Sequence, residues 1–186
     1  MIRTHRLTFL LTLIAGFVLP ILASAAEPWQ ALVRERLKLY GHRNWIVVAD
    51  SAYPAQAAPG VETVVVDADQ TQVVRFVLAR LQESNHARAV LYTDKELAFV
   101  PEADAAGVSQ YRRDLAGLFG EQPVTTLPHE DIIQKLDETS QKFRVLIIKT
   151  NMAIPYTSVF IELRAAYWGD EPEKRLREAM AGSSKK

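Results

Sequence analysis

The chain has 186 residues, of which 48% are hydrophobic and 24% charged, and its 22 basic residues balance its 22 acidic ones. These values are typical of a single globular domain and exclude a disordered or fibrous protein. The sequence contains no cysteine, which excludes disulfide bonds and a thiol nucleophile.

Residues 1–26 have the composition of a secretory signal peptide. Two arginines form a basic start, the stretch from Leu7 to Leu22 is mainly apolar, and small residues follow it. That order predicts cleavage after Ala25 or Ala26. The apolar run is rather short for a membrane span, although an uncleaved N-terminal anchor is the alternative. We therefore expect a periplasmic or secreted protein with no stable membrane insertion after cleavage.

The expected mature chain carries a slightly negative formal charge, because the signal contains two basic residues and no acidic ones. A weakly acidic domain lacks the positive surface that nucleic acid requires, so we expect no nucleic-acid partner. The remaining length of about 160 residues is sufficient for a substantial hydrophobic core.

Helical spacing of apolar residues alternates with short β-branched runs along the rest of the chain. Helices are predicted at 28–40, 73–81, 108–118 and 129–140. Strands are predicted at 45–50, 61–67, 88–93, 123–128, 143–150 and 158–163, with 95–100 as a short extra strand. Two glycines, Gly41 and Gly120, follow predicted helices and are expected just past their ends.

This alternation predicts one α/β domain over residues 27–164, a layered α/β/α structure with a mostly parallel central sheet. Residues 165–186 are expected to form a C-terminal extension with a charged surface helix and a frayed tail. The sequence contains no dinucleotide-binding or phosphate-binding loop, no zinc-binding H-E-x-x-H and no G-x-S-x-G nucleophile elbow. The remaining candidates are histidines and carboxylates at the ends of elements.

Three such residues stand out. His42 follows a predicted helix end, whose dipole favours a protonated imidazole. Asp50 ends a predicted strand, at the edge where open α/β sheets place their ligands, and a carboxylate there can accept hydrogen bonds from sugar hydroxyls. His129 lies in the first turn of a predicted helix, which favours the neutral ring. The alternative is that both histidines only flank their helices.

The segment GHRNWIVVADSAYPA, residues 41–55, resembles the signature of the D-ribose pyranase / L-fucose mutarotase (RbsD/FucU) family. The shared features are a Gly-His pair, an apolar strand, an aspartate eight residues after the histidine, and an aromatic or apolar residue before proline. The segment FRVLIIKTNMAIPYTSVFIEL, residues 143–163, is similar to the family's closing pattern. The resemblance covers roughly Leu32 to Leu163.

This resemblance implies an RbsD/FucU-like fold and a set of site residues. In such enzymes the histidine that matches His42 is the acid/base residue that interconverts sugar ring forms, without a metal or cofactor. The implied sugar-binding residues are Asp50, His129, Tyr156 and Ser158, the last in place of the family's asparagine. Tyr53 stands where the family often has an aromatic residue, so sugar stacking and plain packing are both open. Family members form rings, so we expect a homo-oligomer.

The chain departs from the family pattern at Asn44, where an acidic residue is usual, and at Ser158, which lacks an amide. We therefore consider three functions. The first is an exported mutarotase or pyranase that uses His42. The second is a non-catalytic periplasmic module that binds a small polar ligand or another protein, and a purely structural ring-forming protein is a third. Convergence of His42, Asp50, His129 and Tyr156 on one sugar-sized pocket would favour the enzyme.

Overall fold

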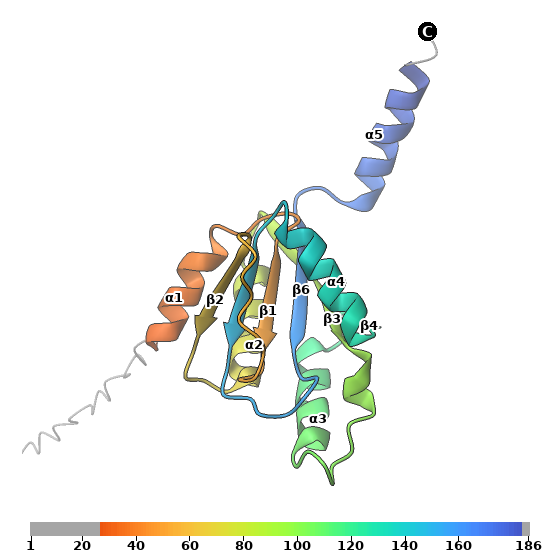
Figure 1. Cartoon of the computed structure of the whole chain (residues 1–186). Helices are drawn as coiled ribbons and strands as arrows, with labels where there is room; N and C mark the ends of the chain where they lie inside the picture. The colour runs from red at the N-terminus through yellow and green to blue at the C-terminus, as the bar shows by residue number, and fades with distance from the viewer. Residues whose placement is uncertain (1–26, 184–186) are drawn as a thin grey trace, which may run out of the picture.

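The computed structural model describes residues 27–183 (Figure 1). Its helices are α1 (Pro28–Leu37), α2 (Gln70–Gln82), α3 (Val108–Phe119), α4 (His129–Ser140) and α5 (Asp170–Ser183), with a short 3-10 helix, η1, at Lys95–Ala98. Its strands are β1 (Trp45–Ala49), β2 (Val61–Val65), β3 (Ala87–Asp94), β4 (Val124–Leu127), β5 (Val145–Lys149) and β6 (Val159–Ala165). The predicted signal segment and the last three residues of the predicted tail lie outside the described residues.

The six described strands form one sheet in the order β2-β5-β1-β6-β3-β4. The pairs β1–β5, β2–β5 and β3–β4 are parallel, whereas β6 runs antiparallel to both β1 and β3. Five strands therefore point the same way, which confirms the predicted mostly parallel sheet. The carboxyl ends of these five strands and the start of β6 share one edge, which we call the carboxyl edge. Open α/β sheets place their ligands at such an edge.

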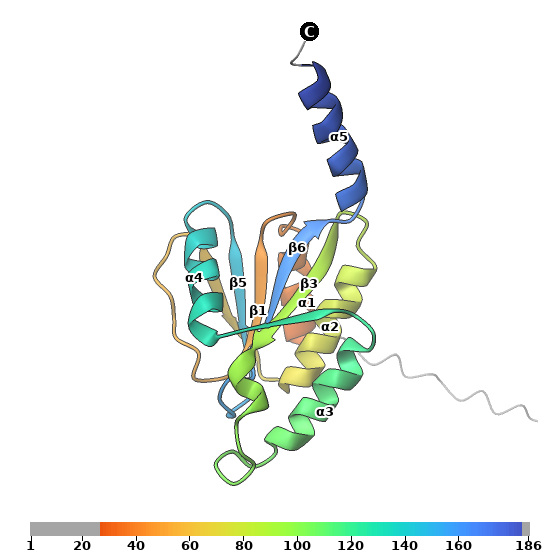
Figure 2. The ribbon, with the colours of Figure 1, turned by 90° about the vertical axis from the view of Figure 1, so that its right-hand side faces the viewer.

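Helices cover both faces of the sheet: α1, α2 and α3 lie on one face and α4 on the other (Figures 1 and 2). The side chains of β1 alternate between the two cores, with Ile46 and Val48 in the larger core under α1–α3 and Trp45 and Val47 in the smaller core under α4. Every residue of β1 is buried. This confirms the prediction of a strand covered on both faces, which its continuous apolar run indicated.

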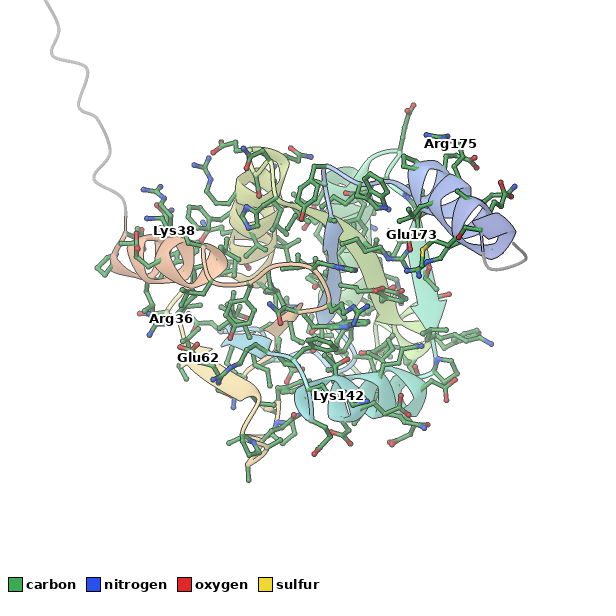
Figure 3. The ribbon with its side chains drawn as sticks, turned by 90° about the horizontal axis from the view of Figure 1, so that it is seen from above. Arg36, Lys38, Glu62, Lys142, Glu173 and Arg175 are labelled. Carbon is green, nitrogen blue, oxygen red and sulfur yellow. The ribbon has the colours of Figure 1, made fainter. Side chains whose placement is uncertain are left out.

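Helix α1 packs in the larger core beside α2 and is joined to the edge strand β2 by an ion pair. Its residues Trp29, Val33 and Leu37 are buried. Arg36 and Glu62 point toward each other (Figure 3), and Arg36 Nε donates to Glu62 Oε1 at 2.5 Å. Because both side chains are about one third exposed, this ion pair orients the helix rather than contributing most of its stability.

Two local predictions were wrong. The run 95–100 begins as the 3-10 helix η1, not as a strand, because β3 extends through Asp94 and only Leu97 of the run's first four residues is buried. Helix α1 ends at Leu37, so Gly41 lies beyond its cap at Lys38. The chain reverses at Arg43, with a φ of 75°, before β1 begins.

Glu102 caps the start of α3, and this contact predicts a pH dependence of stability. Its carboxylate accepts the backbone N–H groups of Gly107 at 2.5 Å and Ser109 at 2.9 Å. These bonds lower the pKa of Glu102 from 4.5 to about 2. The lowered folded-state pKa means that the stabilisation is complete above about pH 4.5 and is lost as the pH falls toward 2.

We therefore expect Glu102→Gln to lower the urea midpoint at pH 7, and the difference from wild type to shrink as the pH is lowered to 3. Glu121→Gln, at an exposed carboxylate, serves as the control. Its urea midpoint should equal that of wild type at both pH 7 and pH 3. A difference for Glu102→Gln that stays constant between pH 7 and pH 3 would contradict this account.

The C-terminal helix α5 projects away from the rest of the chain (Figures 1 and 2), and none of its residues is buried. Trp168 Nε1 donates to Glu173 at 2.7 Å, and Glu173 pairs with Arg177. These contacts join the preceding linker to the first turns of the helix. Among the described residues, no helix combines the length and the apolar composition needed to cross a bilayer.

Candidate functional site

Four of the residues predicted from the sequence line one pocket of about 520 Å³ at the carboxyl edge: Asp50, Tyr53, His129 and Tyr156. They come from three parts of the chain, namely the loop after β1, the start of α4 and the loop before β6. The other lining residues are Ser51, Ala52, Pro54, Gln56, Glu130, Ile133, Ala153, Ile154 and Pro155. The volume is within the usual range for small-molecule sites.

A larger pocket of about 640 Å³ lies near the start of β3, and its lining includes Leu78, Leu81, Arg88 and Arg164. No histidine or carboxylate lines it. It therefore lacks a group that can exchange protons near neutral pH. The smaller pocket, at the carboxyl edge, is the candidate site.

Asp50 is held in place by two hydrogen bonds. The backbone N–H of Ala52 donates to Oδ1 at 2.9 Å, and the Ser158 hydroxyl lies 3.5 Å from Oδ2. A carboxylate has about four acceptor positions, so this one retains capacity for hydroxyl groups of a ligand. Asp50 therefore supplies an acceptor at the pocket wall.

Ser158 is buried at 1% exposure and is not among the residues that line the pocket. Its contact is with Asp50, whose carboxylate it helps to orient. The direct sugar contact predicted for Ser158 stays a prediction, and the observed role of its hydroxyl is to support Asp50.

His129 is the first residue of α4 and is anchored twice by carboxylates at the end of β3 and just after it. Its ring Nδ1 lies 3.0 Å from Asp94 Oδ1, and its backbone N–H donates to both oxygens of Glu96 at 3.0 and 3.1 Å. The Glu96 bond lowers the pKa of that carboxyl. About one third of the His129 side chain is exposed, so part of the ring remains accessible from the pocket.

Asp94 was missed in the sequence analysis. Its side chain is fully buried, and burial raises the pKa of its carboxyl while the bond with His129 opposes that change. A usable signal was present, because Asp94 ends β3 just as Asp50 follows β1. The rule that identified Asp50 therefore applies equally to Asp94.

Two buried oxygen atoms near the site lack hydrogen-bond partners within the described part of the chain: Tyr53 Oη and Asp94 Oδ2. The Tyr53 hydroxyl lies near the Gln56 side chain but makes no hydrogen bond of standard geometry. Burial, followed by the charge of Asp94, raises the pKa of Tyr53. Unpaired buried polar atoms are costly and uncommon, and they often occur at functional sites.

Tyr156 packs its ring edge-to-face against the ring of His129, with a centroid distance of 5.6 Å and an interplanar angle of 79°. Its φ of 58° is unusual for a residue other than glycine. The next residue holds it there, because the buried Thr157 carbonyl accepts from Gln70 Nε2 at 2.5 Å and Tyr111 Oη at 2.6 Å. Such supported backbone strain is typical of ligand sites.

The structure does not bring His42 to the pocket of its own chain. His42 precedes β1 and is exposed, whereas Asp50 follows β1 at the opposite edge of the sheet. The five residues of β1 span about 16 Å at 3.3 Å per residue. Asn44 stands in place of the usual acidic residue. Its side-chain oxygen accepts the backbone N–H of Arg144 at 2.9 Å, so its contact is with the backbone just before β5.

The composition of the pocket limits the ligands that suit it. It offers a carboxylate, an imidazole and aromatic and apolar walls, but no lysine or arginine lines it. This arrangement suits a neutral ligand with several hydroxyl groups better than a phosphorylated one. Within residues 27–183, no three histidine or acidic side chains gather in an arrangement that would hold a metal ion.

Comparison with known proteins places the chain beside one protein family. Residues 31–163 match the RbsD / FucU transport protein family. The structure of RbsD from Bacillus subtilis in complex with D-ribose aligns with a TM-score of 0.52 and 20% identity, over 75% of this chain and 94% of that one. At this identity the likeness concerns the fold.

Two further structures align with lower scores. FucU from Bifidobacterium longum has a TM-score of 0.47 and 15% identity, over 69% of this chain and 90% of that one. The fucose mutarotase from Streptococcus pneumoniae in complex with L-fucose has a TM-score of 0.46 and 18% identity, over 69% and 87%. No curated protein matches the chain.

Proposed function

Because the chain belongs to the RbsD / FucU transport protein family, we propose that it binds an unphosphorylated monosaccharide and interconverts its ring forms or anomers. The observation that carries this proposal is the convergence of Asp50, His129 and Tyr156 on one pocket of about 520 Å³. The similar fold of RbsD from Bacillus subtilis, whose structure contains D-ribose, supports the same class of ligand.

The pocket contains the groups that such a reaction needs. Ring opening removes the proton of the anomeric hydroxyl and adds a proton to the ring oxygen, and an imidazole suits both transfers near neutral pH. In our proposal Asp50 accepts hydrogen bonds from sugar hydroxyls, while Tyr156 and Ile133 flank the sugar ring. This chemistry requires no metal and no cofactor.

The acid/base role that the family resemblance implies for His42 requires a second copy of the chain. His42 lies at the opposite edge of the sheet from its own pocket, so only a neighbouring copy can present it there. We therefore propose a homo-oligomer in which His42 of one copy reaches the pocket of the next. Export to the periplasm or beyond is proposed from the N-terminal segment alone.

Saturation-transfer NMR on a panel of aldoses, beginning with D-ribose and L-fucose, tests this function. We expect wild type to exchange anomers or ring forms of at least one sugar faster than buffer does. His42→Ala is compared with His86→Ala, an exposed histidine bonded to Ser84. Light scattering on each sample gives the number of copies in the assembly.

The outcomes separate the candidate functions. Exchange no faster than in buffer would exclude turnover of those sugars, and retained binding without exchange would favour the non-catalytic binding module. Slower exchange in His42→Ala but not in His86→Ala, with the assembly intact, would support a role for His42 between copies. Unchanged exchange in His42→Ala would exclude that role.

A further inference from the structure

The histidine that lines the pocket of its own chain, His129, is positioned by a carboxylate on its far side. Asp94 Oδ1 lies 3.0 Å from Nδ1 of His129. An ionised carboxylate only accepts hydrogen bonds, so this contact places the ring proton on Nδ1. The other nitrogen, Nε2, is then the basic atom available to a ligand in the pocket. Glu96 fixes the backbone of the same residue.

The cost of this arrangement indicates that it does more than stabilise the fold. The Asp94 side chain has no exposed surface, and its second oxygen has no hydrogen-bond partner among the described residues. Burying a half-paired carboxylate destabilises a folded protein, and a neutral or apolar residue would fill the space at lower cost. A costly carboxylate bonded to a pocket histidine is the pattern of an acid/base site.

We propose that His129 transfers protons during sugar ring opening, with Nε2 facing the pocket, and that Asp94 is its positioning residue. This inference rests on the proposed function and deepens it. It assigns proton transfer to a residue of the same chain as the pocket, in addition to any contribution from His42 of a neighbouring copy. Tyr156, packed against the ring of His129, limits its reorientation.

The step balances with one imidazole. Neutral Nε2 accepts the proton of the anomeric hydroxyl, the C1–oxygen bond of that group becomes a carbonyl, and the bond between C1 and the ring oxygen breaks. The imidazolium then returns its proton to the ring oxygen, which restores the neutral histidine. The buried carboxylate of Asp94 stabilises the transient positive charge and keeps the same nitrogen toward the sugar.

The test compares wild type with His129→Gln and Asp94→Asn on the first aldose that wild type exchanges, with D-ribose tried first. We expect His129→Gln to lower kcat for exchange about 100-fold or more. Asp94→Asn should lower kcat at least tenfold and change KM less than about threefold, because it alters the ring and not the sugar contacts. Asp131→Asn, an exposed carboxylate in the first turn of α4, is the control and should retain wild-type kcat.

A spectroscopic readout separates positioning from a general loss of stability. In ¹⁵N NMR of labelled protein, His129 should carry its proton on Nδ1 in wild type. In Asp94→Asn the amide donates to Nδ1, so the proton should move to Nε2. If Asp94→Asn fails to fold, the tautomer of His129 in wild type still tests the positioning role of Asp94. A proton on Nε2 in wild type would overturn that role.

The failures of the two proposals are distinguishable. If wild type exchanges no aldose, the proposed function fails and this inference fails with it. If wild type exchanges a sugar but His129→Gln stays within twofold of its rate, only the inference fails. A third outcome is slow exchange in His129→Gln, together with a normal kcat and an unchanged tautomer in Asp94→Asn. That result would support proton transfer by His129 and overturn the positioning role of Asp94.

Discussion

Replacement of Phe160 by alanine is expected to lower the free energy of unfolding by about 3–5 kcal/mol. Phe160 lies on β6, the strand between β1 and β3, and its side chain is fully buried in the smaller core under α4. That core has few members, so its other side chains can fill only part of the vacated space. Because small domains unfold with about 5–15 kcal/mol, the loss is a large fraction of the total.

Urea unfolding at pH 7 measures this loss, provided that the slope of the transition stays the same as in wild type. Phe160→Leu, which keeps most of the apolar volume, is the matched control and should cost clearly less. A loss below about 1 kcal/mol for Phe160→Ala would contradict the packing described here. Helix α4 packs on this core through Ile132 and Leu136, so the alanine variant should also disturb His129 at the start of the helix.

Asp50→Asn is expected to weaken sugar binding about 10- to 100-fold while leaving the fold intact. A hydrogen bond to a charged group contributes about 1.5–3 kcal/mol, and each 1.4 kcal/mol corresponds to a tenfold change in affinity. The carboxylate receives only the Ala52 N–H and the distant Ser158 hydroxyl within the described chain, so its remaining acceptor positions are open to the ligand. In asparagine an amide donor replaces one acceptor oxygen.

Titration by NMR, with the aldose that wild type binds, measures the change in Kd. The matched control is Asp67→Asn, an exposed carboxylate that follows β2 at the same edge of the sheet but is not among the pocket residues. We expect wild-type affinity in the control. Equal affinities for wild type and Asp50→Asn would show that Asp50 does not contact the sugar.

Local sequence patterns determined the identity of most elements and part of the site. The run WIVVA is a continuous apolar stretch rich in β-branched residues, as expected for a strand that is buried on both faces. This pattern can be recognised without knowing which strands lie beside it. Asp50 and His129 were found because each lies where an element ends or begins, and the carboxyl edge of a parallel sheet collects such residues. The spacing of apolar side chains and the turn residues indicate where helices and strands begin and end, and both signals depend only on nearby residues.

At one position the local pattern was insufficient to predict the type of secondary structure. The run at 95–100 is too short to show a period, and it forms a helical turn whose Glu96 accepts the backbone N–H of His129 on α4. A residue so close to His129 in space is 33 positions away in sequence. Composition alone therefore could not distinguish a turn from a strand at this point.

The tertiary structure alone decided which of these residues meet. Insertion of β6, antiparallel, between β1 and β3 brings Tyr156 and Ser158 to the same edge as Asp50. Parallel pairing of β3 with β4 places Asp94 beside His129, whereas His42 stays at the opposite edge from its own pocket. Strand order depends on hydrogen bonds and burial between segments that are distant in sequence. The local spacing of apolar residues therefore does not predict it. The residue types at the strand ends were therefore readable from the sequence, but their partners were not.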